Sequence, residues 1–189
     1  DGTVERMIDE MQLESRGLRA GRGRRVGFND EAFFDRKAAG HHGLGRPLDF
    51  DDASIAAIAE VPQICPSLHL PVQSGSDAQL RGMKRGYTMA QYRDLVSRLR
   101  RAVPGLALTT DIIVGFCGER DDDFRRTCDL MEEIRFDSAF TFRYSERSGT
   151  EAARRRADDV PEAVKGERLR RVIDLQERIS WEINQDAVG

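Results

Sequence analysis

The stretch LALTTDIIVGFCGERDDDF, residues 106–124, decides the fold of this chain. It opens with a β-branched, apolar run at 109–114, which Pro104 and Gly105 precede and Gly115 follows. A run of this kind, bounded by turn residues, predicts a buried strand. Three aspartates at 121–123 then open an amphipathic segment, and carboxylates in a first turn favour the start of a helix. The stretch therefore predicts a strand, a tight glycine turn and a helix.

Such a junction is a common ligand site, because α/β proteins bind ligands beyond the carboxyl ends of their strands. A phosphate site favours bare N–H groups and a Lys or Arg at the helix start, whereas residues 121–123 are all acidic. We therefore expect a neutral or cationic ligand in preference to a phosphate. The alternative is that the glycines only form a tight turn, and the residues alone do not decide between the two.

Composition sets the outer limits. The chain has 189 residues, of which 33% are charged and 39% hydrophobic, and its net charge is -3. These values indicate one soluble globular domain without the overall basic character of a nucleic-acid-binding protein. No apolar run reaches the length of a membrane span, and no signal-peptide pattern is present. Three cysteines without CxxC spacing (Cys65, Cys117 and Cys128) indicate a reducing compartment, so we expect a cytoplasmic monomer with no membrane contact.

Residues 1–46 differ from the rest. Residues 3–11 have one helical apolar face, but 15–46 are rich in Gly and Arg and follow no clear period. The Arg-Gly run could contact RNA phosphates, although a solvated loop is the simpler interpretation. His41 and His42 have no obvious third partner, so we expect no metal site there. We therefore divide the chain into an atypical segment, 1–46, and a domain, 47–189.

Helices and strands alternate from residue 47 onward. The patterns predict helices over 49–60, 76–86, 88–103, 121–134 and 161–188, and strands over 67–72, 109–114 and 138–144. Helical crossovers between strands predict a parallel sheet. Three strands leave an unpaired edge that earlier strands would have to meet. We therefore predict an α/β fold, the C-terminal half of an open (β/α) barrel.

Several single residues stand out at the ends of these strands. Gln73 and Ser74 follow the first strand and are free to face a ligand, whereas Ser76 has the capping-box spacing to Gln79 and predicts a helix cap. His69 points away from the neighbouring leucines, either as a hydrogen-bonded core residue or toward a barrel lumen. Cys117 lies in the glycine turn and could be a reactive thiol.

Four motifs carry a family resemblance: HLPVQSGSD (69–77), MKRGYTMAQY (83–92), TTDIIVGFCGE (109–119) and RFDSAFTFRYSERSGT (135–150). Together they resemble the radical S-adenosylmethionine methylthiotransferases over residues 47–189. The resemblance is strongest to the branch that adds a methylthio group to isopentenylated adenosine beside the tRNA anticodon. The ribosomal-protein branch is similar but less so. It stays open as an alternative, as does a cluster-free half-barrel that binds a nucleoside or RNA.

The resemblance implies a six-unit, partial (β/α) barrel of the TIM type, in which the three predicted strands, with the second extended to 108–114, are the fourth, fifth and sixth. It also implies a set of residues that bind S-adenosylmethionine. Gln73 and Ser74 would approach its ribose and methionine parts, Ile113 and Gly115 would pack on its adenine, Glu119 would anchor the turn, and Tyr144 and Ser145 would line the adenine pocket.

The implied chemistry begins when a 4Fe-4S cluster cleaves S-adenosylmethionine to a 5′-deoxyadenosyl radical, which takes a hydrogen from the adenine ring of the tRNA. A second 4Fe-4S cluster helps to deliver sulfur from a donor that the resemblance does not identify. The chain departs from the family because the CxxxCxxC motif, the three further cluster cysteines and the C-terminal RNA-binding domain are all missing, and because Cys117 and Ser148 replace prolines. We therefore expect a fragment that is inactive by itself.

Overall fold

The computed structural model describes residues 47, 50–60, 66–147 and 150–188, all of which belong to one unit, Lys37–Gly189. The expected helix at 3–11, the Arg-Gly run, the histidine pair, Cys65 and Ser148 lie outside the described residues. The predicted domain boundary between residues 46 and 47 also depends on that part of the chain, so it stays a prediction.

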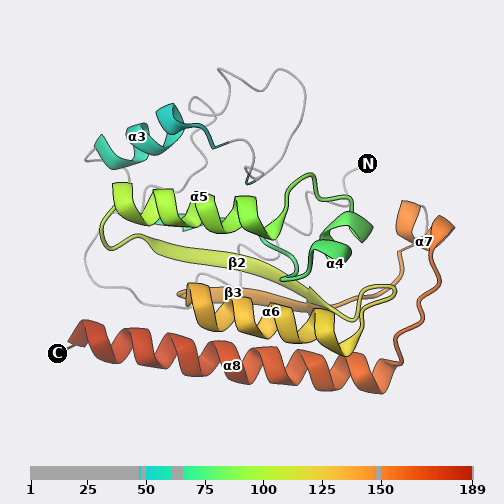
Figure 1. Cartoon of the computed structure of the whole chain (residues 1–189). Coiled ribbons are helices and arrows are strands. Elements are labelled where there is room, and N and C mark those ends of the chain that lie inside the picture. The colour runs from blue at the N-terminus through green and yellow to red at the C-terminus, as the bar shows by residue number, and fades with distance from the viewer. Residues whose placement is uncertain (1–46, 48–49, 61–65, 148–149, 189) are drawn as a thin grey trace. The chain divides into compact units, whose positions relative to one another are not determined.

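The described elements alternate as the sequence predicts (Figure 1). In chain order they are α3 (Asp52–Glu60), β1 (Ser67–His69), α4 (Asp77–Gly82), α5 (Met89–Ala102), β2 (Ala107–Val114), α6 (Asp121–Ile134), β3 (Ser138–Arg143), α7 (Glu151–Arg155) and α8 (Glu162–Val188). Only the short helix α7 was not predicted, because five residues are too few to show a helical period.

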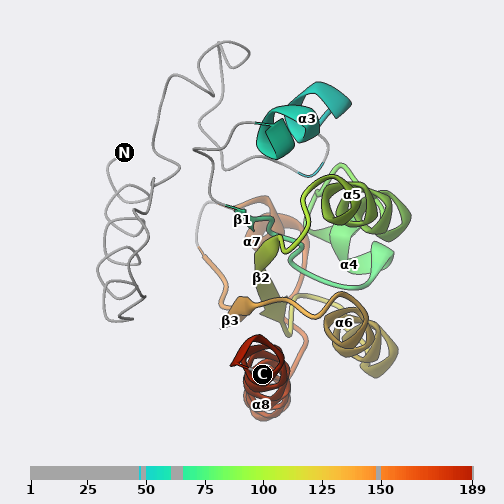
Figure 2. The same cartoon turned by 90° about the vertical axis from the view of Figure 1, so that its left-hand side faces the viewer.

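The three strands form a parallel sheet in the order β1-β2-β3, as predicted. Ser67 lies opposite Ala107, and Thr109 lies opposite Ser138. Seen end-on, α4, α5 and α6 lie on one side of the strands, and α8 lies beyond β3 (Figure 2). The described strands do not close a barrel, so the architecture is an open α/β sheet with helices outside it.

Strand β1 ends at His69, three residues before the predicted end. Pro71 explains the difference, because it has no N–H group to donate to the neighbouring strand. The N–H of Leu70 still bonds Thr109 O at 2.8 Å, but the N–H of Val72 turns to the Thr110 hydroxyl at 3.0 Å. Pairing resumes at an isolated bridge between Gln73 and Ile112.

The core lies between β2 and the helices. Burial alternates along β2, so that Leu108, Ile112 and Val114 face the helices and their neighbours face the other way. Tyr92 of α5 is fully buried against them, and its hydroxyl donates to Leu70 O at 2.8 Å. Each such large apolar side chain contributes about 1.5–3 kcal/mol when fully buried.

The two predicted capping boxes have different outcomes. Thr88 caps α5 as expected, with reciprocal hydrogen bonds to Gln91. Ser76 stands at the N-cap of α4, as predicted, but its side chain does not make the bond of a capping box. The Ser76 hydroxyl instead donates to Asp123 Oδ1 at 2.6 Å, because a charged acceptor on α6 lies within its reach.

Candidate functional site

Four of the predicted cofactor residues converge at the carboxyl ends of the strands. The N–H of Gln73 donates to Asp111 O at 2.8 Å, and the N–H of Ile113 donates to Gln73 O at 2.9 Å. Tyr144 reaches the same point from β3, because its N–H donates to Val114 O at 2.8 Å. Gly115 follows Val114 directly. The backbones of Gln73, Gly115 and Tyr144 are therefore held side by side around the end of β2.

The loop after Gln73 is tightly packed on α6. Gln73 itself has a positive φ of 69°, which is a strained value for a residue with a side chain. Ser74 is fully buried, and its hydroxyl lies 3.3 Å from Thr127 Oγ1, which also accepts the N–H of Gly75 at 3.0 Å. The Ser74 hydroxyl is therefore used within the protein, which leaves Gln73 as the residue of this pair that can face a ligand.

Glu119 closes the turn that follows β2. Its Oε2 accepts the N–H of Gly115 at 2.6 Å and a guanidinium N–H of Arg168 at 2.8 Å. Burial raises the pKa of Glu119 above its ordinary value, although the Gly115 N–H and Arg168 favour its charged form. The other oxygen, Oε1, is buried and has no hydrogen-bond partner. Glu119 thus anchors the turn from inside, with Arg168 of α8 beneath it.

Lys165 of α8 was not predicted, yet it lies at the centre of this edge. Its side chain is 1% exposed, and its ammonium group bonds Asp158 at 2.7 Å and Glu162 at 2.8 Å. Burial lowers the pKa of Lys165, but the two carboxylates outweigh that effect and raise it overall. The local pattern does not predict this burial, since Glu162 and Lys165 have the spacing of an exposed helical ion pair. Its burial becomes visible only once α8 packs against the sheet.

Tyr144 and Ser145 differ in what they offer. The Tyr144 ring packs edge-on against Phe116 with centroids 4.9 Å apart, and the Lys165 ammonium lies 5.6 Å from the ring centroid. Burial raises the pKa of Tyr144 to about 12. Its hydroxyl is buried with the Cys117 thiol beside it, but no hydrogen bond of ordinary geometry completes it. Ser145 is exposed. Tyr144 and Glu119 are therefore the two predicted site residues that each carry a buried oxygen without a hydrogen-bond partner.

The acidic residues 121–123 led us to expect a neutral or cationic ligand beside them. In the structure, the three aspartates of α6 bond other residues of the protein instead. Asp121 pairs with Arg168 at 2.7 Å, and Asp122 pairs with Arg125 at 3.0 Å. Asp123 accepts from Ser76, as described above. These contacts use the three carboxylates within the protein, so they no longer argue for a cationic ligand.

His69 lies on the face of the sheet opposite the helices, as predicted. Its Nδ1 is 2.9 Å from the Thr109 hydroxyl, and its Nε2 is 3.3 Å from Asp111 Oδ1. The Phe140 ring meets the imidazole edge-on at 5.9 Å. Ile113 lies two residues beyond Asp111 on the same face. Cys117 is buried as a free thiol in the turn, and Cys128 is a buried core residue on α6.

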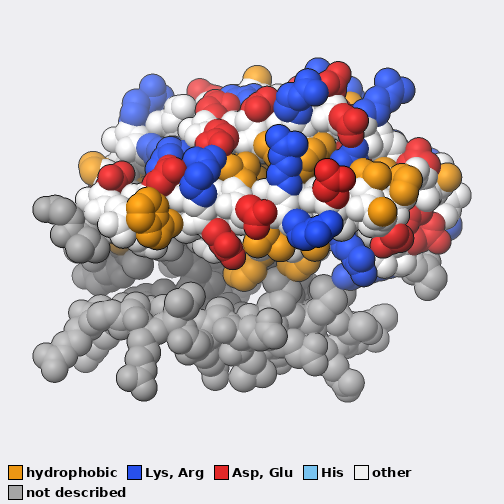
Figure 3. All heavy atoms as spheres, turned by 90° about the horizontal axis from the view of Figure 1, so that it is seen from below, with side chains coloured by type: hydrophobic (Ala, Val, Ile, Leu, Met, Phe, Trp, Pro, Cys, Tyr) orange, Lys and Arg blue, Asp and Glu red, His pale blue; other side chains and the backbone are white. Residues whose placement is uncertain are grey.

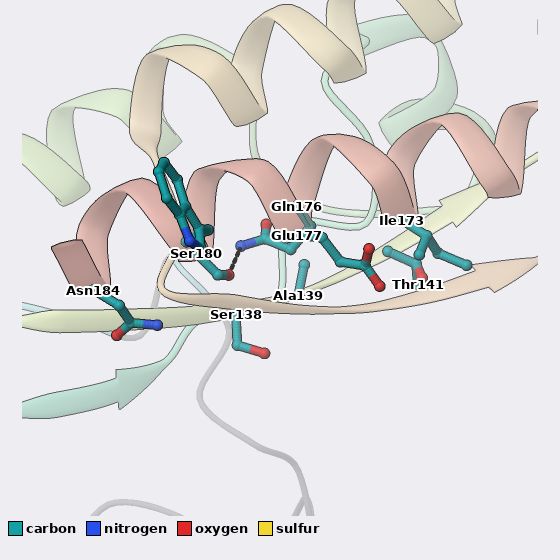
Figure 4. A pocket seen from close by; sticks show the side chains of 9 residues that line it. Ser138, Ala139, Thr141, Ile173, Gln176, Glu177, Ser180 and Asn184 are labelled. Atoms are coloured by element: carbon teal, nitrogen blue, oxygen red, sulfur yellow. Dashed lines mark hydrogen bonds between the residues drawn. The ribbon is translucent and has the colours of Figure 1, made fainter.

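A separate hollow of about 490 Å³ lies between β3 and α8 (Figure 4). Its lining includes Ser138, Thr141, Gln176 and the exposed Trp181 but none of the predicted cofactor residues. The surrounding α8 surface carries charges of both signs among scattered apolar side chains (Figure 3). This hollow is therefore not the predicted cofactor site.

Two further observations concern the described part of the chain only. No three of its His, Cys, Asp or Glu side chains gather where they could hold a metal ion. A 4Fe-4S cluster needs several thiolates together, so these residues do not fit one. No helix in the same part of the chain is long and apolar enough to cross a membrane.

The fold and this edge can now be compared with known proteins. Residues 44–131 match the radical SAM superfamily. This stretch of the chain is therefore a radical SAM domain. Coproporphyrinogen III oxidase from Escherichia coli, described as a radical SAM enzyme, has a similar structure. The match covers 71% of this chain and 31% of the oxidase chain. The TM-score is 0.57 at 18% sequence identity, so this likeness supports the fold alone.

Curated relatives with greater sequence similarity carry the name tRNA-2-methylthio-N(6)-dimethylallyladenosine synthase. The relative from Porphyromonas gingivalis is 54% identical over 143 residues, which cover 76% of this chain and 31% of the relative. The relative from Mycolicibacterium vanbaalenii is 52% identical and is covered to 28%. The chain therefore spans about a third of the length of these relatives. The domain match and these relatives confirm the predicted resemblance, and the likeness to a radical SAM structure confirms the predicted fold class.

Proposed function

We propose that this chain is part of a tRNA methylthiotransferase and that its carboxyl edge binds S-adenosylmethionine. The observation that carries the proposal is the convergence of Gln73, Gly115 and Tyr144 at the end of β2. Relatives about half identical to the chain are named for the tRNA product that the resemblance implies. The substrate would then be N6-isopentenyladenosine beside the anticodon, and the enzyme would act in the cytoplasm as a monomer.

The residues at this edge fit the nucleoside part of that cofactor. Tyr144 has an unsatisfied hydroxyl, which a ribose or adenine could complete. Gln73 and Ile113 end the neighbouring strands and would line the same space, while Ser74 and Glu119 hold the loops behind them. Ser145 is exposed and would contact the ligand from the rim. One molecule of S-adenosylmethionine would supply the 5′-deoxyadenosyl group of the reaction, and a second molecule would supply the methyl group.

The iron–sulfur clusters are a different case. The radical SAM family implies them, and the methylthiotransferase branch implies two 4Fe-4S clusters. The described residues provide no thiolate set for either cluster. We therefore assign no step of the reaction to this chain through a cluster. Instead we propose that this segment positions the cofactor, whereas the cluster ligands and the sulfur donor come from outside it.

Calorimetry with S-adenosylmethionine on the 189-residue chain tests the proposal. We expect binding without iron, and we expect Tyr144→Phe to weaken it by about threefold to tenfold, the worth of one hydrogen bond. Tyr92→Phe is the matched control, since its hydroxyl bonds Leu70 O inside the core. Equal affinities in the wild type and Tyr144→Phe, or no binding at all, would contradict the assignment of this edge.

A chimaera tests the reaction itself. Residues 47–189 would replace the matching segment of the Porphyromonas gingivalis relative, and mass spectrometry would measure methylthio-adenosine in tRNA. We expect product from the chimaera and none from the chain alone. An inactive but folded chimaera that still binds S-adenosylmethionine would instead favour a nucleoside-binding half-barrel.

A further inference from the structure

Two basic segments that are far apart in the sequence meet beside the candidate site. Residues 81–85 contain Arg81, Lys84 and Arg85, and residues 154–156 are all arginine. The two segments come close together at Gly82 of α4, because a Cβ added at Gly82 would lie 3.2 Å from a guanidinium nitrogen of Arg156. Figure 1 shows α4 beside the carboxyl end of β2 and α7 at the same end of the sheet. We call residues 81–85 and 154–156 the basic rim.

The basic rim is connected to the candidate site by ring contacts. The Arg156 guanidinium lies 5.9 Å from the centroid of the Phe116 ring. Phe116 in turn packs edge-on against Tyr144. Arg156 is thus placed by an aromatic face on one side and by the backbone of Gly82 on the other, and it lies one ring away from Tyr144.

Four arginines of the basic rim are not paired with a described carboxylate, whereas Lys84 and Arg155 interact with other groups of the protein. Arg81, Arg85, Arg154 and Arg156 are exposed, and none makes an ion pair with another described residue. Among the neighbouring carboxylates, Asp158 pairs with Lys165, and Asp159 and Asp77 accept the backbone N–H groups of Gly118 and Met89. None of the three bonds an arginine of the rim.

Arginines on the outer helices are mostly arranged differently. Arg93, Arg98, Arg125, Arg135 and Arg178 each pair with a carboxylate. Unpaired arginines also occur there, as at Arg101 near the end of α5, but the basic rim is where two basic segments adjoin. A local excess of unpaired arginine attracts a polyanion, and the guanidinium fork matches phosphate oxygens.

We propose that the basic rim binds the phosphate backbone of the RNA next to the nucleotide that enters the candidate site. The proposal rests on the proposed function, because that function brings an RNA to this edge. Contacts to phosphates fix position and register without reading the sequence. The rim would therefore orient the strand, and other parts of the enzyme would recognise the base.

The salt dependence of RNA binding tests this proposal on the 189-residue chain. The probe is a fluorescent RNA hairpin with the sequence of an anticodon stem-loop, and its affinity is measured by anisotropy over a range of KCl concentrations. We expect Arg81→Gln/Arg156→Gln to weaken binding and to reduce the slope of log K against log salt by about 1–2, because each lost phosphate contact removes about one unit. The control is Arg101→Gln/Arg170→Gln, which removes two exposed arginines away from the rim, neither of them in an ion pair with a described residue.

Three outcomes would overturn the proposal: no binding of the hairpin at low salt, equal slopes for the two double variants, or competition by polyglutamate as strong as that by RNA. Strong competition by polyglutamate would indicate that the rim binds an acidic protein instead of RNA. Failure of the proposed function is separate, since it would appear as lost S-adenosylmethionine binding in the wild type. A chain that binds this cofactor but shows equal salt slopes refutes only the basic rim.

Discussion

Lys165 fills the space beside Gly115 that a side chain would need. A Cβ added at Gly115 would lie 3.1 Å from Lys165 Cδ and nearer still to Cγ. The lysine cannot move aside, because Asp158 and Glu162 hold its ammonium group. Glycine is therefore required here by a neighbouring residue of the protein as well as by its φ of 72°.

Gly115→Ala should therefore destabilise the chain more than strain alone would. We expect a loss of about 2–4 kcal/mol, the sum of a left-handed alanine and an overpacked contact. Gly118→Ala is the matched control, since Gly118 has a φ of 76° but nothing within 4 Å of the added Cβ. It should lose only about 1–2 kcal/mol in the same urea titration. Equal losses of unfolding free energy in the two variants would show that the Lys165 side chain moves aside for the added methyl group.

Gly75→Ala should be more damaging than a helical glycine replacement. An added Cβ at Gly75 would lie 2.7 Å from Thr127 Cα and would also collide with the carbonyl of Arg126. Since backbone atoms cannot rotate away, we expect a loss of at least about 2 kcal/mol or failure to fold. Gly166→Ala in α8 meets open space and should gain about 0.5–1 kcal/mol. Thermal melts of the two variants should shift in opposite directions.

Asp123 should make stability depend on acid pH. Burial raises its pKa, but the Ser76 hydroxyl, the Arg120 N–H and the Gln79 amide outweigh that effect and lower it overall. A lowered pKa contributes stability above the unfolded value, and that contribution is lost as the pH falls through the folded value. We expect Asp123→Asn to cost about 1–2 kcal/mol at neutral pH and the difference from wild type to narrow below about pH 4.

The control for this prediction is Asp122→Asn. Asp122 is exposed and pairs with Arg125 on the same helix, so its loss should cost less than about 0.5 kcal/mol. Urea titrations at several pH values measure both variants. A pH-independent difference between Asp123→Asn and wild type would show that the Ser76 contact does not depend on the charge.

Thr110→Val should destabilise the sheet although it preserves shape. The Thr110 hydroxyl accepts the N–H of Val72 at 3.0 Å and donates to Leu70 O at 2.9 Å, so it replaces the pairing that Pro71 interrupts. Valine leaves a buried N–H without a partner, at a cost of about 1–3 kcal/mol. Thr141→Val, at a half-buried position on β3 that makes no such bond, should stay within about 0.5 kcal/mol of wild type in the same titration.

Much of the fold follows from local pattern. The β-branched run at 109–114 and its flanking glycines predicted β2, and the Thr88–Gln91 spacing predicted the start of α5. Ser76 shows where local pattern is not sufficient. Its spacing to Gln79 is that of a capping box, but the Ser76 hydroxyl donates instead to a carboxylate 47 residues away in the sequence. Which of two local options wins depends on contacts that exist only after the helices pack.

The candidate site shows the same limit. The motifs of the family placed Gln73, Gly115 and Tyr144 at one edge, and the structure brings them together, while their role in binding the cofactor stays a prediction. Nothing in the sequence singled out Lys165 or Arg168, because both belong to a long helix in which charged residues usually face solvent. Their burial comes from α8 packing beneath the turn, which no pattern within α8 encodes.

The turn after β2 is held by Glu119, Arg168 and Lys165 independently of any ligand. Ordering a mobile loop on binding costs about 1–2 kcal/mol for each residue that is fixed. Here the turn is already ordered in the folded chain, so a small molecule that binds at this edge would cause little further loss of backbone entropy. Binding at this edge should accordingly proceed with little change in the backbone.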